Sequence, residues 1–102
     1  MILEVAVLDV RPGQEEAFEA AMRAARPLIA ATPGFGGIEL RRCHEAAHRY
    51  LLLVTWARLE DHTIGFRQSS RYAAWRDLLH RFYDPFPIVE HYGEPIALDP
   101  PA

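Results

Sequence analysis

The sequence is poor in cysteine and has no long apolar segment. Cys43 is the only cysteine among 102 residues, which excludes an internal disulfide and leaves it as a small apolar side chain. No apolar run approaches the ~20 residues that a membrane-spanning helix needs. The opening MILEVAVLDV has no basic region before its apolar residues, so it does not resemble a signal peptide. We therefore expect a cytoplasmic protein with no membrane partner.

An excess of charge of either sign is also missing. Eleven basic and fourteen acidic residues give a net charge of -3, and both signs are spread along the chain. No basic stripe follows from this distribution, which argues against a nucleic-acid partner. Half of the residues are apolar and a quarter charged, as in ordinary globular proteins. We expect one domain over residues 1–96, followed by a proline-rich and partly disordered tail over residues 97–102.

Two segments are apolar on both faces of an expected strand. In YLLLVTW, Tyr50 to Trp56, alternate side chains point to opposite faces, yet neither set is polar. The segment from Ile2 to Val10 has the same character, and its two acidic residues lie near its ends. A sheet with one wet face alternates apolar and polar residues, so both faces of these strands must be covered.

The other elements follow from helical periodicity and from turn residues. An apolar stripe predicts a helix over residues 14–31, in which Pro27 should kink or end the regular part. Residues 38–43 and 88–92 read as short strands. A short helix should begin at Leu59, and Ser69 or Ser70 should cap a further helix.

This order of elements predicts an α+β, ferredoxin-like βαββαβ fold. It has a four-stranded antiparallel sheet with both helices on one face. The second face of the sheet then needs a partner, and the same face of a second copy of the chain is the simplest one. We therefore expect a homodimer in which sheet packs on sheet, as in a dimeric α/β barrel.

Three features of this layout carry a resemblance to a known family. They are PGFGG before the second strand, TW at the end of the third strand, and an aromatic helix after it. The segment from about Met1 to Tyr92 resembles the antibiotic biosynthesis monooxygenase superfamily. The resemblance implies a dimeric α/β barrel, and several members oxidise phenolic or anthrone-type aromatics with O2 and without metal or flavin. Others degrade haem, and many have no assigned activity.

The haem-degrading branch differs from this chain at three positions. Those relatives carry Asn on the first strand, Trp in the helix after the TW strand, and His on the next helix. The corresponding residues here are Ala6, Phe66 (or Gly65, one residue away) and Trp75. The resemblance therefore implies that this chain lies outside that branch and has no cofactor.

His62 is the candidate general base. Leu59, His62 and Phe66 share one helix face, so the imidazole should point inward among apolar side chains. A histidine facing an aromatic cavity can abstract a proton, and the electron-rich anion that forms can reduce O2. The alternative is a core histidine whose ring nitrogens are satisfied by a carbonyl group.

Aromatic residues and a second histidine complete the predicted site. The residues that could line a flat pocket for a planar aromatic ligand are Phe66, Tyr72, Trp75 and Phe82. They could equally be core residues. His91, in the fourth strand, could contact substrate or could make a hydrogen bond at an interface. His80 lies off the aromatic stripe of its helix and is expected to be solvated.

Metal-ligand spacing is absent, because no pair of histidines follows a pattern such as His-x-x-x-His. We therefore expect no metal site. Two functions stay open at this stage: a cofactor-independent monooxygenase acting on a small aromatic molecule, and a non-catalytic dimeric barrel that binds a small ligand. A haem-binding relative is a third and weaker possibility.

Overall fold

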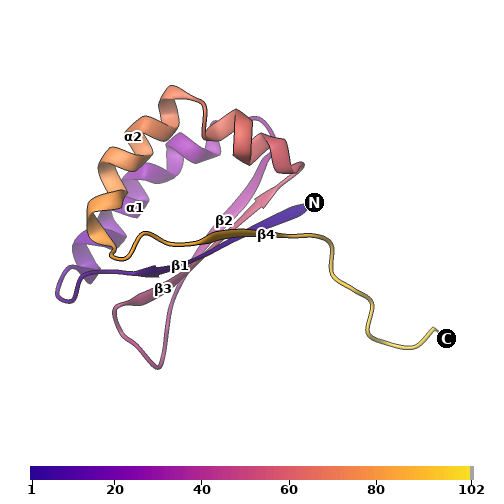
Figure 1. Ribbon diagram of the computed structural model, residues 1–102, viewed down its shortest axis with the longest axis horizontal. Coiled ribbons are helices and arrows are strands. Elements are labelled where there is room, and N and C mark those ends of the chain that lie inside the picture. Colours follow the sequence, from indigo (N-terminus) through magenta and orange to yellow (C-terminus); the bar gives the residue numbers. More distant parts are fainter. Residues whose placement is uncertain (102) are drawn as a thin grey trace.

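The computed structural model describes residues 1–101, which form one sheet covered by helices on one side (Figure 1). The elements are, in chain order, β1 (Ile2–Asp9), α1 (Glu15–Ala30), β2 (Phe35–Arg42), β3 (Arg49–Trp56), η1 (Asp61–Phe66), α2 (Ser70–Leu79), η2 (His80–Phe82) and β4 (Val89–Tyr92). The strands lie in the order β2-β3-β1-β4, and all neighbours are antiparallel. The predicted ferredoxin-like fold is confirmed.

The two doubly apolar strands form the centre of the sheet. β1 and β3 pair along their whole length, from Ile2 opposite Trp56 to Asp9 opposite Arg49. Their inward side chains are buried beneath the helices: Ala6, Leu8, Tyr50, Leu52, Val54 and Trp56. Alternation therefore sends the other half of each strand outward, away from α1 and α2.

Helix α1 covers the sheet through the predicted apolar stripe, with Phe18, Met22, Ala25 and Ile29 buried. The sequence predicts that Pro27 kinks this helix or ends its regular part; Pro27 does not end it, because α1 continues to Ala30. The carbonyl of Pro27 accepts a hydrogen bond from the N–H of Ala31 at 3.1 Å. Pro27 itself is exposed, so the carbonyl that loses its usual N–H partner faces water.

Strand β2 begins at Phe35, earlier than the predicted start at Ile38. The pairing with β3 shifts between Phe35 and Gly37, which marks a bulge. Gly36 lies close to β3, since a Cβ added there would come within 3.3 Å of the Thr55 side chain and carbonyl. Gly36 and Gly37, which are predicted to precede the second strand, are therefore part of an irregular strand.

Gly34 joins α1 to β2 in a conformation that only glycine fits. Its φ is +91°, and an added Cβ would lie 2.1 Å from a carboxylate oxygen of Asp61. We expect Gly34→Ala to lower the free energy of unfolding by roughly 2–3 kcal/mol, as backbone strain adds to the clash. Denaturant titration measures this loss. Gly13→Ala is the matched control, because Gly13 has a similar φ of +89° with no atom within 4 Å, and should cost only about 1 kcal/mol.

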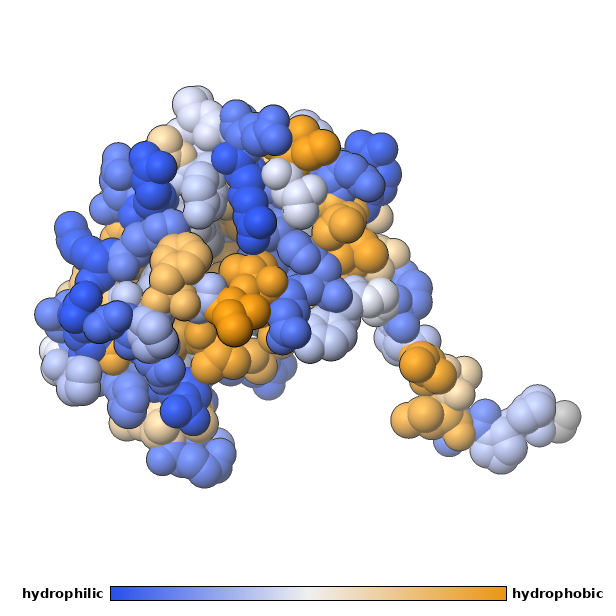
Figure 2. Space-filling model, viewed as in Figure 1, coloured by the Kyte–Doolittle hydropathy of each residue, from blue (hydrophilic) through white to orange (hydrophobic). Residues whose placement is uncertain are grey.

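The outer face of the sheet is apolar and carries no element of this chain. Its centre is formed by Leu3, Val5 and Val7 of β1 and by Leu51 and Leu53 of β3, and Val7 is 47% exposed. The two edge strands place polar side chains on the same face: Glu39, Arg41, Glu90 and Tyr92. After β4, residues 93–101 extend away from the body without regular structure (Figure 1). Ile96 and Leu98 in this segment are exposed. Figure 2 shows hydrophobic atoms, in orange, on the extended segment. Within residues 1–101, no helix has the length and apolar character to cross a membrane.

Candidate active site

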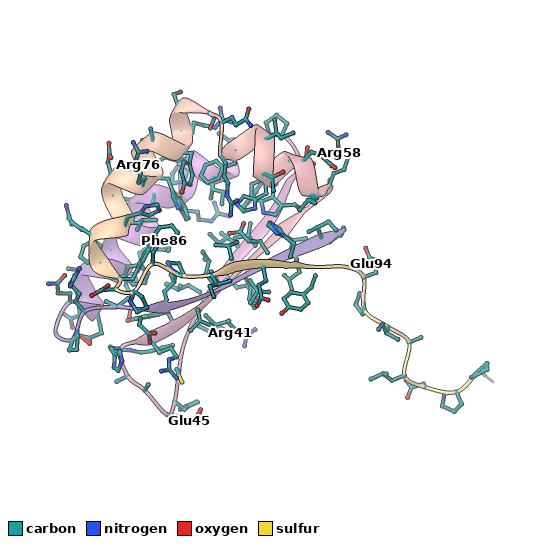
Figure 3. The ribbon with its side chains drawn as sticks, viewed as in Figure 1. Arg41, Glu45, Arg58, Arg76, Phe86 and Glu94 are labelled. Atoms are coloured by element: carbon teal, nitrogen blue, oxygen red, sulfur yellow. The ribbon has the colours of Figure 1, made fainter. Side chains whose placement is uncertain are left out.

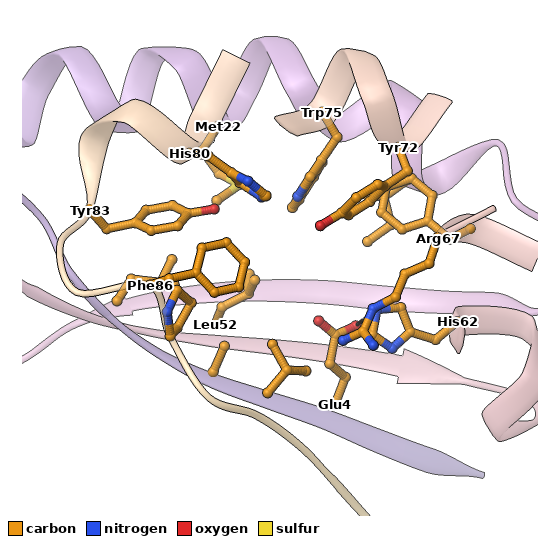
Figure 4. Close-up of a pocket in the computed structure, with 16 residues that line it drawn as sticks. Glu4, Met22, Leu52, His62, Arg67, Tyr72, Trp75, His80, Tyr83 and Phe86 are labelled. Atoms are coloured by element: carbon orange, nitrogen blue, oxygen red, sulfur yellow. Dashed lines mark ion pairs between the residues drawn. The ribbon is translucent and has the colours of Figure 1, made fainter. Parts of the chain in front are cut away.

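A cavity of about 450 Å³ lies between the sheet and the helices (Figure 4). Its floor is formed by Ala6, Leu8 and Leu52 from the central strands. Helix α2 contributes Tyr72 and Trp75 to the opposite wall. The volume falls within the range of roughly 300–1,000 Å³ that is usual for small-molecule sites. The cavity can therefore hold a planar aromatic molecule between apolar and aromatic walls.

One end of the cavity is polar and contains Glu4, His62 and Arg67 (Figure 4). Glu4 is only 5% exposed, and its Oε1 accepts a hydrogen bond from the Trp56 indole N–H at 2.9 Å. Burial raises the pKa of the Glu4 carboxyl, while the Trp56 hydrogen bond and the Arg67 charge act in the opposite direction. Glu4 is thus a buried carboxyl group at the cavity wall.

His62 lies beside Glu4 and is 3% exposed. Its ring stacks on Trp56 with 5.3 Å between ring centroids, and its Nε2 is 3.4 Å from Oε1 of Glu4. On the other side, its Nδ1 is 2.7 Å from Nε2 of His91. Burial, together with the nearby Arg67 and His91, lowers the pKa of His62 to about 3. The imidazole is therefore neutral at pH 7 and carries one N–H.

The turn that presents His62 is a π-helix rather than an α-helix. In η1 the N–H of Arg67 donates to the carbonyl of His62 at 3.1 Å, a bond that spans five residues. His62 and Phe66 both point inward from this turn and are buried. The prediction that a short helix after Trp56 turns His62 inward is confirmed. The hydrogen bond of this turn spans one residue more than the hydrogen bond of an α-helix.

The opposite end of the cavity is formed by His80, Tyr83 and Phe86. The Tyr83 hydroxyl points into the cavity in Figure 4, and burial raises its pKa. Phe86 comes from the segment before β4 and lies beneath α2 (Figure 3), with its ring centroid 4.9 Å from that of His80.

The prediction that His80 is solvated is wrong, because His80 lines the cavity and burial lowers its pKa. The chain leaves α2 at Leu79 and enters the 3-10 turn η2, in which successive side chains are about 120° apart instead of 100°. An extrapolated α-helical stripe therefore misplaces this residue.

Four of the six predicted site residues lie on the cavity wall: His62, Phe66, Tyr72 and Trp75. Phe82 does not; it is buried in the core, with its ring 5.9 Å from that of Phe18. His91 does not line the cavity either, and instead contacts His62 from behind. The hydrogen bond that His91 makes is therefore to a side chain of its own chain, rather than one shown at an interface.

Sequence reasoning missed Glu4 as a site residue. One signal was present: Glu4 is a single carboxylate on the same strand face as Ile2, Ala6 and Leu8, which are apolar. A charge on the buried face of a central strand needs a hydrogen-bond partner. The indole N–H of Trp56, on the neighbouring strand, is that partner.

Nothing among residues 1–101 forms a group of three or more His, Cys, Asp or Glu side chains arranged to hold a metal ion. The spacing between His62 and His91 agrees with this, since their nitrogens are 2.7 Å apart. Two imidazole nitrogens on one tetrahedral zinc ion would lie about 3.3 Å apart. The two rings are joined by a hydrogen bond between Nδ1 of His62 and Nε2 of His91.

The chain is similar to several known proteins. The antibiotic biosynthesis monooxygenase family model matches residues 1–78. The uncharacterised protein YczJ of Bacillus subtilis (strain 168) is 52% identical over 94 residues, which cover 92% of this chain and 99% of that protein. A Bordetella bronchiseptica crystal structure described as "Putative antibiotic biosynthesis monooxygenase" is 38% identical with a TM-score of 0.89, covering 93% of this chain and 97% of that one.

A more distant structure shares the fold. SnoaB from Streptomyces nogalater, described as a cofactor-independent oxygenase, has a TM-score of 0.80 at 15% identity, with 95% of both chains covered. The family model covers most of this chain, and the relatives at 52% and 38% identity align over nearly all of it. The chain therefore belongs to the antibiotic biosynthesis monooxygenase family.

Proposed function

We propose that this protein is a cofactor-independent monooxygenase that oxidises a small phenolic or anthrone-like aromatic molecule with O2. The observation that carries this proposal is the aromatic-walled cavity with an acid–base centre, Glu4 and His62, at one end. Membership of the family and the likeness of the fold to a cofactor-independent oxygenase support it.

The chemistry begins with removal of a proton from the substrate by the acid–base centre. Arg67 lines the same end of the cavity, and its positive charge stabilises the aromatic anion that forms. The anion is electron-rich and reduces O2, forming a carbon–oxygen bond to a peroxide anion. Return of the proton gives a hydroperoxide, which loses water and leaves a carbonyl group. An anthrone CH2 and one O2 thus become C=O and H2O.

The His62→Ala variant tests this function. We expect wild-type protein to consume O2 with a panel of anthrones and hydroquinones, and the variant to lose about a hundredfold in rate, because the acid–base centre loses the side chain that lies against Glu4. An oxygen electrode measures both. Uptake that is unchanged in His62→Ala would remove His62 from the mechanism.

A non-catalytic barrel that binds a small ligand is the second candidate function. The low pKa of His62 favours it, since such an imidazole acting alone is a weak base. Binding of aromatic ligands by wild-type protein, with no O2 uptake across the panel, would support this alternative. A haem-binding role predicts a shift of the Soret band on titration with hemin, and we expect no shift.

We also propose that two copies pair through the apolar outer face of the sheet. Leu3, Val5, Leu51 and Leu53 form a continuous patch there, because Val5 is the cross-strand neighbour of Leu53 and Leu3 lies two residues away. Water contact with such a patch is unfavourable, and a two-fold axis brings the same patch of a second copy against it.

A further inference from the structure

Within the acid–base centre, we infer that Glu4 receives the substrate proton, and that His62, itself hydrogen-bonded to His91, positions the Glu4 carboxylate through the contact of its Nε2 with Oε1. This inference rests on the proposed function and assigns roles within it. Glu4 becomes the catalytic residue, and His62 becomes a positioning residue.

The two oxygens of Glu4 are in different surroundings. Oε1 accepts the Trp56 indole N–H at 2.9 Å and lies 3.4 Å from His62 Nε2. Within residues 1–101, the side-chain contacts found for Glu4 all involve Oε1. Figure 4 shows the carboxylate at the cavity wall, with space beside it toward Tyr72 and Phe86. Oε2 is thus the oxygen that a bound substrate can reach.

The nitrogens of His62 are both occupied by protein groups. Nε2 faces Glu4, and Nδ1 lies 2.7 Å from Nε2 of His91. A neutral imidazole has one N–H, so only one of these sides can donate. An ionised Glu4 favours the tautomer with the proton on Nε2, because two acceptors facing one another would repel. Nδ1 then accepts from the N–H at Nε2 of His91, and no nitrogen of His62 is left for the substrate.

The electrostatics of the centre support the same assignment. Burial raises the pKa of Glu4, which brings a carboxylate closer to the proton affinity of a base that works near neutral pH. The groups that face Glu4 are His62 from η1, Arg67 just after η1, Trp56 from β3 and His91 from β4. Of these only Arg67 is charged at pH 7, since burial lowers the pKa values of His62 and His91.

The proton passes from the substrate to Glu4 and later returns. A substrate O–H or activated C–H bond breaks, its electron pair stays on the substrate, and the proton forms an O–H bond at Oε2 of Glu4. The same proton returns to the peroxide anion after O2 has reacted, which restores the carboxylate. The chain from His91 through His62 to Oε1 keeps its tautomers throughout.

A coloured phenol tests the assignment without requiring turnover. 4-Nitrophenol turns yellow when it ionises, so its spectrum in the cavity reports whether its proton has been taken. At a pH where the free probe is still largely colourless, we expect bound probe to be yellow in wild type and in His62→Gln. We expect it to be colourless in Glu4→Gln, and Glu4→Asp to restore part of the colour.

Three results would overturn the assignment: a yellow probe bound to Glu4→Gln, a colourless probe bound to His62→Gln, or no yellow form in wild type. The histidine tautomers give a second measurement, by ¹⁵N NMR of the wild-type protein at pH 7. We expect the proton of His62 on Nε2, and a proton on Nδ1 would contradict the chain. Failure of the proposed function is distinguishable, because it gives ionised bound probe with no O2 uptake from any substrate.

The positioning role of His91 has its own readout. His91→Phe removes the donor to Nδ1 of His62 but leaves Glu4 in place. We expect the probe to remain yellow, with the pH at which colour appears shifted because the carboxylate is less well held. A pH profile identical to that of wild type would remove His91 from the chain.

Discussion

Replacing Leu53 by Arg is expected to turn the proposed homodimer into a monomer, raising the dissociation constant by about a thousandfold or more. Leu53 lies on β3 in the middle of the sheet and opposite Val5 of β1. Burial of a leucine side chain contributes about 1.5–3 kcal/mol, and a two-fold interface contains the residue twice. An arginine there would also replace the apolar contact with a long charged side chain that must lose its water at the interface, even though Glu39 of β2 lies opposite position 53.

Sedimentation velocity over a range of concentrations measures this change. Ile64→Arg is the matched control, since Ile64 is an exposed aliphatic residue on η1, on the helix side of the sheet. We expect that variant to sediment as wild type does. A Leu53→Arg protein that remains dimeric, or a wild-type protein that is monomeric at micromolar concentration, would contradict the proposed pairing.

The second large effect concerns stability in acid. The pKa of His62 is lowered to about 3 in the folded protein, against 6.5 in the unfolded chain. Between these values the unfolded chain binds more protons, so His62 makes the folded state lose stability as the pH falls from 6.5 toward 3. We expect a loss on the order of 3 kcal/mol between pH 7 and pH 4, after allowing for relaxation around the ring.

His62→Gln should remove this dependence of the free energy of unfolding on pH, whatever the substitution does to stability at pH 7. Chemical denaturation at a series of pH values gives the slope for each protein. Glu4 contributes with the opposite sign, because its raised pKa makes the folded state lose stability as the pH rises above 4.5. Glu4→Gln should therefore steepen the acid loss. His44→Gln, in the exposed turn between β2 and β3, shows the effect of removing a histidine away from the site.

The sheet and the inward direction of His62 could be predicted because they depend on local periodicity. A seven-residue strand with apolar residues on both sides, such as Tyr50 to Trp56, has few alternatives to a central position. His62 and Phe66 stay on the buried face when the α-helix is replaced by a π-helix. Leu59, which the helical spacing placed on the same face, is 39% exposed, so that part of the prediction is wrong.

The polar centre could not be predicted, because it depends on strand register. Glu4 and His91 are opposite one another in the pairing of β1 with β4, although 87 positions separate them in the sequence. Nothing in either segment alone sets that alignment. A carboxylate near the end of an apolar strand reads as a surface residue until Trp56 and His62 are placed beside it.

The position of β4 has a consequence for how the site behaves on heating. β4 has four residues, lies at the edge of the sheet, and pairs only with β1. Short edge elements open locally at a lower free energy than a protein's core. Each such opening separates His91 from His62 while Glu4, on β1, stays in place. Hydrogen exchange at the amides of Val89–Tyr92 should therefore be faster than in β1 and β3, and the temperature that releases β4 would set the upper limit at which the carboxylate is held for reaction.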